Sequence, residues 1–128
     1  MTKTTKTYHQ RNTEKRVSRI KQTKQFILEN TSGSLMNNHK WYKILEWIEL
    51  SDSKFQIKTL LSNDRIEIDN IFELEKNSIL VDSSGDFIDF MEIEVVKLNC
   101  DSELLKLLDK QNIQYSLSDN QITIAGYI

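Results

Sequence analysis

SLMNNHKWYKILEWI, residues 34–48, decides the fold, because a polar linker becomes an amphipathic helix within this stretch. Apolar side chains recur at positions i, i+3, i+4 and i+7, the spacing that places them on one face of a helix. These residues are Trp41, Ile44, Leu45 and Ile48. Lysine and glutamate residues fall between them. We therefore predict a helix that packs this apolar face against the core and leaves the opposite face in water.

Asparagine marks the start of this helix, at Asn37 or Asn38. An asparagine side chain accepts a hydrogen bond from a free N–H group of the first helical turn. Leu35 or Met36 precedes the cap and can pack back onto that turn, as in a hydrophobic staple. Capping and packing together explain this stretch without a ligand.

The composition indicates one globular domain. The chain has 128 residues, of which 38% are hydrophobic and 28% charged, enough for one core and too few for two. No apolar run approaches the roughly 20 residues that span a bilayer. The basic N-terminal residues are not followed by the apolar segment of a signal peptide. We therefore expect a cytoplasmic protein without a membrane partner.

The residues that usually carry chemistry are scarce. Cys100 is the single cysteine, and the histidines are His9 and His39, so neither a disulfide nor zinc-ligand spacing is expected. The sequence also lacks a nucleophile elbow, a phosphate-binding glycine loop and an H-E-x-x-H motif. We expect no catalytic residues, no cofactor and no metal, and thus a protein that is not an enzyme.

Charge is distributed very unevenly along the chain. Residues 1–25 contain eight Lys or Arg and one acidic residue, Glu14, so this segment carries +7 and the remainder −9 of the total −2. A basic segment joined to an acidic body can act on partners or within the molecule.

The N-terminal part divides into two segments. Residues 1–12 are polar and aperiodic, which predicts a disordered tail. A basic helix is expected over residues 13–30, ended by the loop-forming run NTSGS at 30–34. Its expected apolar stripe consists of Val17, Ile20, Lys24 through its aliphatic stem, Ile27 and Leu28.

Short strands are expected after the helix of residues 34–48, because polar and apolar residues alternate. They cover residues 54–61, 66–68, 71–74 and 79–81, with a bulge or break at Asp69-Asn70. The longest strand is expected over 87–98. A leucine-rich helix capped by Asp101-Ser102 and a hairpin over 113–125 follow. This order predicts an α+β fold for residues 34–128: an antiparallel meander plus a C-terminal hairpin, packed by about three helices.

The run MNNHKW at 36–41 resembles the M-N-[ND]-x-K-W signature of an uncharacterised bacterial domain family. Glu92-Ile93-Glu94-Val95 is similar to the family's E-I-E-W strand, with valine in place of tryptophan. The leucine-rich helix and closing hairpin, Leu104 to Tyr127, are similar as well, so the resemblance covers residues 34–127. It implies this fold and no established activity. Domains of this kind often lie beside genes for toxins and immunity proteins, which is an association only.

Acidic residues gather at Asp82, Asp86, Asp89, Glu92 and Glu94. Carboxylates can serve as general acids and bases or bind a hard cation, so one hypothesis is a hydrolytic or metal-dependent enzyme. The run DSSGD at 82–86 lacks the closing glutamate of a calcium loop, however. Glu92 and Glu94 are expected on one face of a strand, which is either solvated or a protected sheet edge.

The first hypothesis for function is a non-enzymatic acidic domain that binds a basic protein, such as a bacterial toxin that it neutralises. Trp47 falls beside the apolar stripe of its helix and is expected to be partly exposed near Tyr42, as a partner-binding residue. The candidate partner-binding residues are Tyr42, Trp47, Asp89, Glu92 and Glu94.

The alternative is a nucleic-acid-binding accessory protein that uses the basic segment, since Lys and Arg release counterions when they meet phosphates. Its candidate residues are Arg11, Lys15, Arg16, Arg19, Lys21 and Lys24. The segment lacks interleaved aromatic residues, and the acidic body repels a polyanion. The same helix can instead pack on its own acidic domain.

Overall fold

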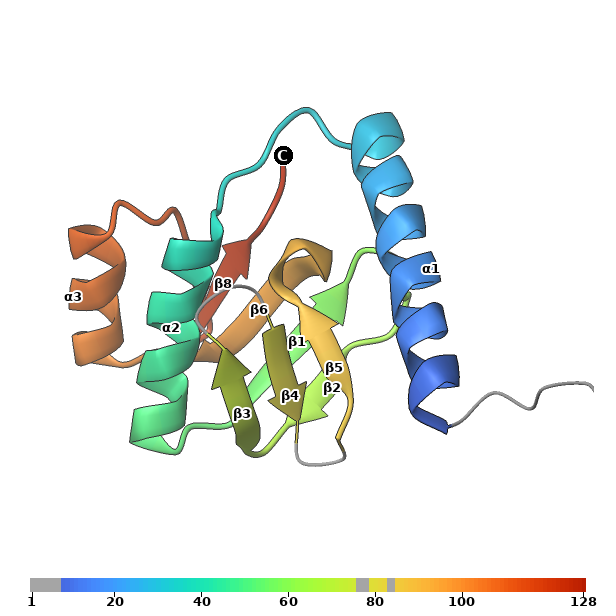
Figure 1. Cartoon of the computed structure of the whole chain (residues 1–128). Coiled ribbons are helices and arrows are strands. Elements are labelled where there is room, and N and C mark those ends of the chain that lie inside the picture. The colour runs from blue at the N-terminus through green and yellow to red at the C-terminus, as the bar shows by residue number, and fades with distance from the viewer. Residues whose placement is uncertain (1–7, 76–78, 83–84) are drawn as a thin grey trace, which may run out of the picture.

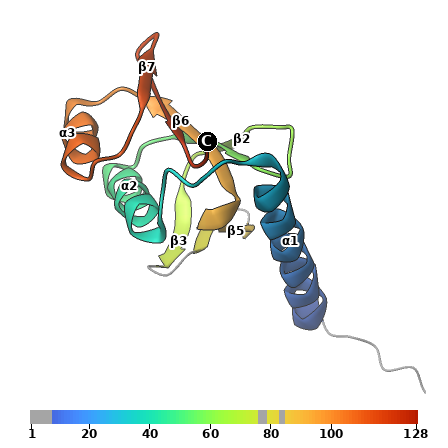
Figure 2. The same ribbon diagram turned by 90° about the horizontal axis from the view of Figure 1, so that it is seen from above.

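The computed structural model of the chain describes residues 8–75, 79–82 and 85–128, which form an α+β fold (Figure 1). This confirms the predicted fold class. The helices of this part of the chain are α1 (Tyr8–Asn30), α2 (Asn38–Ser51) and α3 (Ser102–Lys110). Figure 2 shows α2 and α3 on one side of the strands and α1 on the other.

The strands form two antiparallel sheets. The larger sheet has the order β2-β1-β6-β8-β7 and the smaller one the order β3-β4-β5. The break predicted at Asp69-Asn70 is therefore the point where the chain passes from one sheet to the other. The strands are β1 (Phe55–Thr59), β2 (Ile66–Ile68), β3 (Ile71–Glu75), β4 (Ile79–Asp82), β5 (Phe87–Asp89), β6 (Ile93–Asn99), β7 (Ser116–Ser118) and β8 (Gln121–Ala125).

Helix α2 packs on the core as its spacing predicts. Its buried residues are Trp41, Ile44, Leu45 and Ile48, each at most 3% exposed. Asn37 is the N-cap, and its side-chain oxygen accepts a hydrogen bond from the backbone N–H of Lys40 at 2.8 Å. Met36 also joins the core. The most distinctive stretch of the sequence is thus an architectural element.

The prediction of one strand over residues 87–98 is wrong. Strand β5 ends at Asp89, a short 3₁₀ helix η1 (Phe90–Glu92) follows, and β6 begins at Ile93. The Glu92 carboxylate accepts a hydrogen bond from the backbone N–H of Asp89 at 2.8 Å, which closes this turn. Phe90 is fully buried within it. The local capping contact and the buried ring together explain why the chain turns here from one sheet into the other.

Helix α1 begins at Tyr8 rather than at residue 13, so it includes part of the segment predicted as a disordered tail. Residues 1–7 of that predicted tail lie outside the described residues. The predicted apolar stripe is wrong at both ends, because Val17 is 63% and Leu28 is 80% exposed. Lys24 is exposed as well, whereas Thr23 is fully buried. Ile20 and Ile27 of the predicted stripe are half-buried, as is Phe26, so the face of α1 toward the body is partly apolar.

The linker between α1 and α2 is tied to the C-terminal end of the chain. The backbone N–H of Ser32 donates to the carbonyl of Ile128 at 2.8 Å, and that of Leu35 donates to the carbonyl of Gly126 at 2.9 Å. These bonds hold the linker antiparallel to residues 126–128, which follow β8. The point at which α1 leaves the body is therefore fixed next to Thr31.

The C-terminal segment also packs tightly against η1 and the first residue of β6. A Cβ atom added to Gly126 would lie 2.4 Å from the carbonyl oxygen of Ile93, so only glycine fits there. The Tyr127 hydroxyl donates a hydrogen bond to the carbonyl of Met91 at 2.6 Å. Burial raises the pKa of Tyr127 above its ordinary value of 10.

Candidate functional site

Two neighbouring carboxylates, Asp89 and Glu92, form the centre of the candidate site, and we call them the acidic pair. Asp89 is the last residue of β5 and Glu92 the last residue of η1. Their side chains are 6% and 4% exposed. Burial of carboxylates to this extent requires charged or polar partners, because an unpaired charge away from water is very costly.

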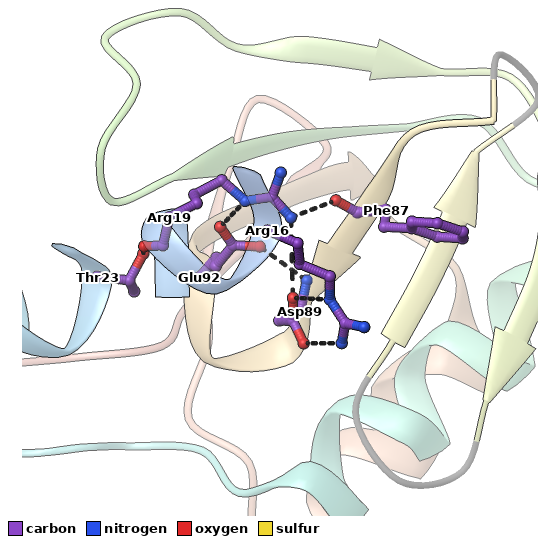
Figure 3. A network of polar contacts seen from close by, with 6 residues as sticks. All are labelled: Arg16, Arg19, Thr23, Phe87, Asp89 and Glu92. Carbon is purple, nitrogen blue, oxygen red and sulfur yellow. Dashed lines mark hydrogen bonds and ion pairs between the residues drawn. The ribbon is translucent and has the colours of Figure 1, made fainter. Parts of the chain in front are cut away.

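Helix α1 supplies these partners through Arg16 and Arg19, which we call the arginine pair. Figure 3 shows both side chains reaching from one face of α1 toward the acidic pair. The two residues are three apart, the spacing at which side chains of a helix lie beside each other.

Arg16 binds Asp89 with both ends of its guanidinium fork. Its Nε donates to Oδ2 at 3.2 Å and its Nη2 donates to Oδ1 at 2.8 Å. A bidentate arginine–carboxylate pair of this kind is stronger and geometrically more specific than a single contact.

Arg19 bridges a carboxylate and a backbone group. Its Nε donates to Glu92 Oε1 at 2.6 Å, while its Nη2 donates to the carbonyl of Phe87 in β5 at 3.0 Å (Figure 3). The same Nη2 lies 3.8 Å from Asp89 Oδ2. Because the other oxygen of Glu92 accepts the Asp89 backbone N–H, all four carboxylate oxygens have donors.

The two halves of this network differ in burial. The arginine side chains remain 34% and 39% exposed, in contrast to the buried acidic pair. One turn further along α1, the hydroxyl of the buried Thr23 donates to the carbonyl of Arg19 at 2.9 Å. The hydrophobic core of the described residues contains no residue of α1. Helix α1 is therefore held outside this core, by the charged hydrogen bonds of the arginine pair together with Thr23 and the half-buried Ile20, Phe26 and Ile27.

The expectation that Glu92 and Glu94 share a solvated strand face is wrong. Glu92 lies in η1 and is buried by Arg19, because the chain turns before β6. Glu94 lies in β6 and forms an ion pair with Lys58 of the neighbouring strand β1. These two carboxylates thus belong to separate contacts.

The aromatic candidates lie elsewhere. Tyr42 and Trp47 are both half-buried and pack against the core from α2. Trp47 lines a groove of about 250 Å³ together with Leu98 and Cys100, at the end of β6 and just before α3. A hydrogen bond to the Glu46 carboxylate raises the pKa of Tyr42 above 10. The groove does not include the acidic pair, so the predicted partner-binding residues do not form one site.

The basic segment is divided between two roles. Arg16 and Arg19 are engaged by the acidic pair, while Lys15, Lys21 and Lys24 are exposed. The side chain of Arg11, also a candidate for binding nucleic acid, lies outside the described part of the chain.

The remaining acidic candidates belong to a turn between β4 and β5. Asp82 is buried, and its Oδ1 accepts a hydrogen bond from the backbone N–H of Asp86 at 3.0 Å. Among residues 8–75, 79–82 and 85–128, no cluster of three or more His, Cys, Asp or Glu side chains is arranged to hold a metal ion. In the same part of the chain, none of the helices has the length and apolar character needed to span a bilayer.

The sequence shows that the basic residues lie in the N-terminal segment and the acidic residues in the body. It does not show that Arg16 and Arg19 bind Asp89 and Glu92. Two signals were available. The arginine pair has the i, i+3 spacing of one helical face, and Asp89 is followed three residues later by Glu92, the spacing of a capping box. Neither signal alone says which side chain of α1 faces which carboxylate.

The fold and site define an α+β domain whose buried acidic pair holds a basic N-terminal helix. Residues 23–128 match DUF6678, a family of unknown function, and the chain belongs to this family. The match includes the acidic pair and begins after the arginine pair. Comparisons with curated proteins and with solved structures gave no match.

Proposed function

We propose that this protein is a non-enzymatic interaction domain that binds a basic protein partner through the acidic pair. The observation that carries the proposal is the way Asp89 and Glu92 hold the arginine pair of α1. The body takes up a basic helix by charged hydrogen bonds, so a basic helix of another protein can use the same groups.

Two further observations support a binding role. Every oxygen of the acidic pair already accepts a hydrogen bond, whereas proton transfer to a substrate needs an oxygen that faces the substrate. The charge of −9 on residues 26–128 attracts a cationic partner and speeds its association. The finer proposal is an immunity-type protein that neutralises a basic bacterial toxin.

Capture from an extract of the native host tests this function. The tagged full chain is compared with an Asp89→Asn/Glu92→Gln variant at low and moderate salt. A control variant, Glu67→Gln/Glu73→Gln, removes the same charge from two exposed positions. We expect one basic protein to be retained by the wild type and the control and lost from the acidic-pair variant.

Identical sets of proteins on all three baits would overturn the proposal. For the finer proposal, the captured protein is expressed alone and together with the full chain. Growth inhibition by the captured protein that the wild-type chain relieves supports neutralisation, and a captured protein without any effect on growth counts against it.

A further inference from the structure

We infer that α1 is a releasable occupant of the acidic pair, and that the partner which replaces it presents two arginines three residues apart on a helix. This inference rests on the proposed function, because it names the partner chemistry and the regulation of the same site. The guanidinium geometry, the spacing along α1 and the way α1 is attached support it.

The contacts select arginine over lysine. Arg16 uses two nitrogens on one carboxylate, and Arg19 reaches Glu92 and the Phe87 carbonyl at the same time. A planar guanidinium has donors in a fixed fork and can make both sets of contacts. A lysine ammonium is a compact point charge and cannot reproduce them. The site therefore selects guanidinium groups over other positively charged groups.

The spacing on the helix is also specified. The acidic residues lie on either end of η1, and the arginines that meet them are at positions i and i+3 of α1. Thr23 follows Arg19 by one turn and is fully buried against the body, with its hydroxyl bonded to its own helix. A small residue is required there for close approach. The motif is thus R-x-x-R-x-x-x-T, with a small residue at the last position.

The attachment of α1 allows it to leave as a unit. No described residue of α1 belongs to the core, and its apolar residues Ile20, Phe26 and Ile27 are only half-buried. The arginine pair is more than one-third exposed on average, so water and salt reach these contacts. The linker beyond Thr31 is held by backbone bonds to the C-terminal segment. Helix α1 can therefore swing away about Thr31 while the rest of the fold stays in place.

Release also exposes groups that attract a replacement. Without α1, the acidic pair loses its cationic donors, and the Phe87 carbonyl at the open edge of β5 loses its hydrogen bond from Arg19. These groups favour a second guanidinium pair over an empty site. In the intact chain, α1 competes at high effective concentration because it is covalently attached.

The test uses full-length protein and a labelled peptide with the sequence of residues 8–30. The chain variant Arg16→Gln/Arg19→Gln weakens the internal occupant, and Lys21→Gln/Lys24→Gln is its charge-matched control at exposed positions. We expect the peptide to bind the arginine variant at least about tenfold more tightly than it binds the wild type or the control. Replacing both arginines of the peptide with lysine should weaken binding to the arginine variant by about tenfold or more.

The role of α1 as an occupant and the selectivity for guanidinium groups are tested by different outcomes. Equal peptide affinity for all three chains would overturn the role of α1 as an occupant, and equal affinity of the arginine and lysine peptides would overturn the guanidinium selectivity. Binding that persists after Asp89→Asn/Glu92→Gln is added to the arginine variant would place the peptide elsewhere and overturn both. Buried Trp41 serves as a fluorescence check that every variant is folded. The capture experiment judges the proposed function independently of these results.

Discussion

Replacing the arginine pair with glutamine should release α1 while the body stays folded. The two arginines make charged hydrogen bonds to the acidic pair, and contacts to charged groups contribute roughly 1.5–3 kcal/mol each when well shielded. Since the arginine side chains are 34% and 39% exposed, we reduce this to about 1–1.5 kcal/mol for each arginine. The docking free energy of α1 should therefore fall by about 2–3 kcal/mol.

Amide hydrogen exchange followed by mass spectrometry measures this loss directly. A long helix detached from its body is only marginally stable in water, so the amides of α1 should exchange faster once the helix is released. A loss of 2–3 kcal/mol corresponds to an increase of about 30- to 150-fold in the exchange rate. The amides of α2 and β6 should keep their protection, because α1 contributes no residue to the core.

The matched control, Lys21→Gln/Lys24→Gln, removes the same charge from exposed positions and should leave exchange in α1 nearly unchanged. Raising the salt concentration should accelerate exchange in wild-type α1 more than in the arginine variant, since the ion pairs are partly exposed. Unchanged protection of α1 in the arginine variant would refute the reasoning. Equal loss of protection in α1, α2 and β6 would refute the separability of α1 from the body.

Three further substitutions test the packing of the body. Gly126→Ala should lower the free energy of unfolding in urea by about 1–3 kcal/mol, because its Cβ would lie 2.4 Å from a backbone oxygen; Gly33→Ala, which meets no atom within 4 Å, is the matched control. Asn37→Ala should cost about 1 kcal/mol in the same assay by removing the cap of α2, and no loss would contradict the capping role. The pKa of Tyr127 is raised in the fold, so its contribution to stability is complete below pH 10 and is lost as the pH rises above 10. Tyr127→Phe should therefore flatten the decline of stability above pH 10, and an unchanged slope would contradict this assignment.

The periodicity of the sequence predicts most of the architecture. Four apolar positions of α2 and its asparagine cap are where the spacing puts them, and the short strands fall close to their predicted ranges. Such patterns are local, and the burial of one face is enough to produce them. The same reasoning fails at residues 87–98, where Asp89 and Glu92 close a turn inside a run that alternates like a strand.

The prediction of which α1 residues contact the body fails for a different reason. The apolar pattern favours Val17 and Leu28 as contact residues, yet both are largely exposed, whereas Ile20 and Ile27 of the same stripe are half-buried. Arg16 and Arg19, which the pattern does not favour, make the charged contacts. An apolar stripe predicts a contact face only when the surface it meets is also apolar. Here that surface contains the acidic pair, which comes from a distant part of the chain, so the facing residues cannot be identified from α1 alone.

The pairing of the linker with the C-terminal segment has a consequence for synthesis of the protein. The bonds from Ser32 and Leu35 to Ile128 and Gly126 can form only after residue 128 has left the ribosome. They also close a very long loop, which delays their formation relative to local contacts. The basic helix is therefore made before the residues that fix its linker, and until Asp89 and Glu92 have also been made its arginines are open to any acidic surface nearby.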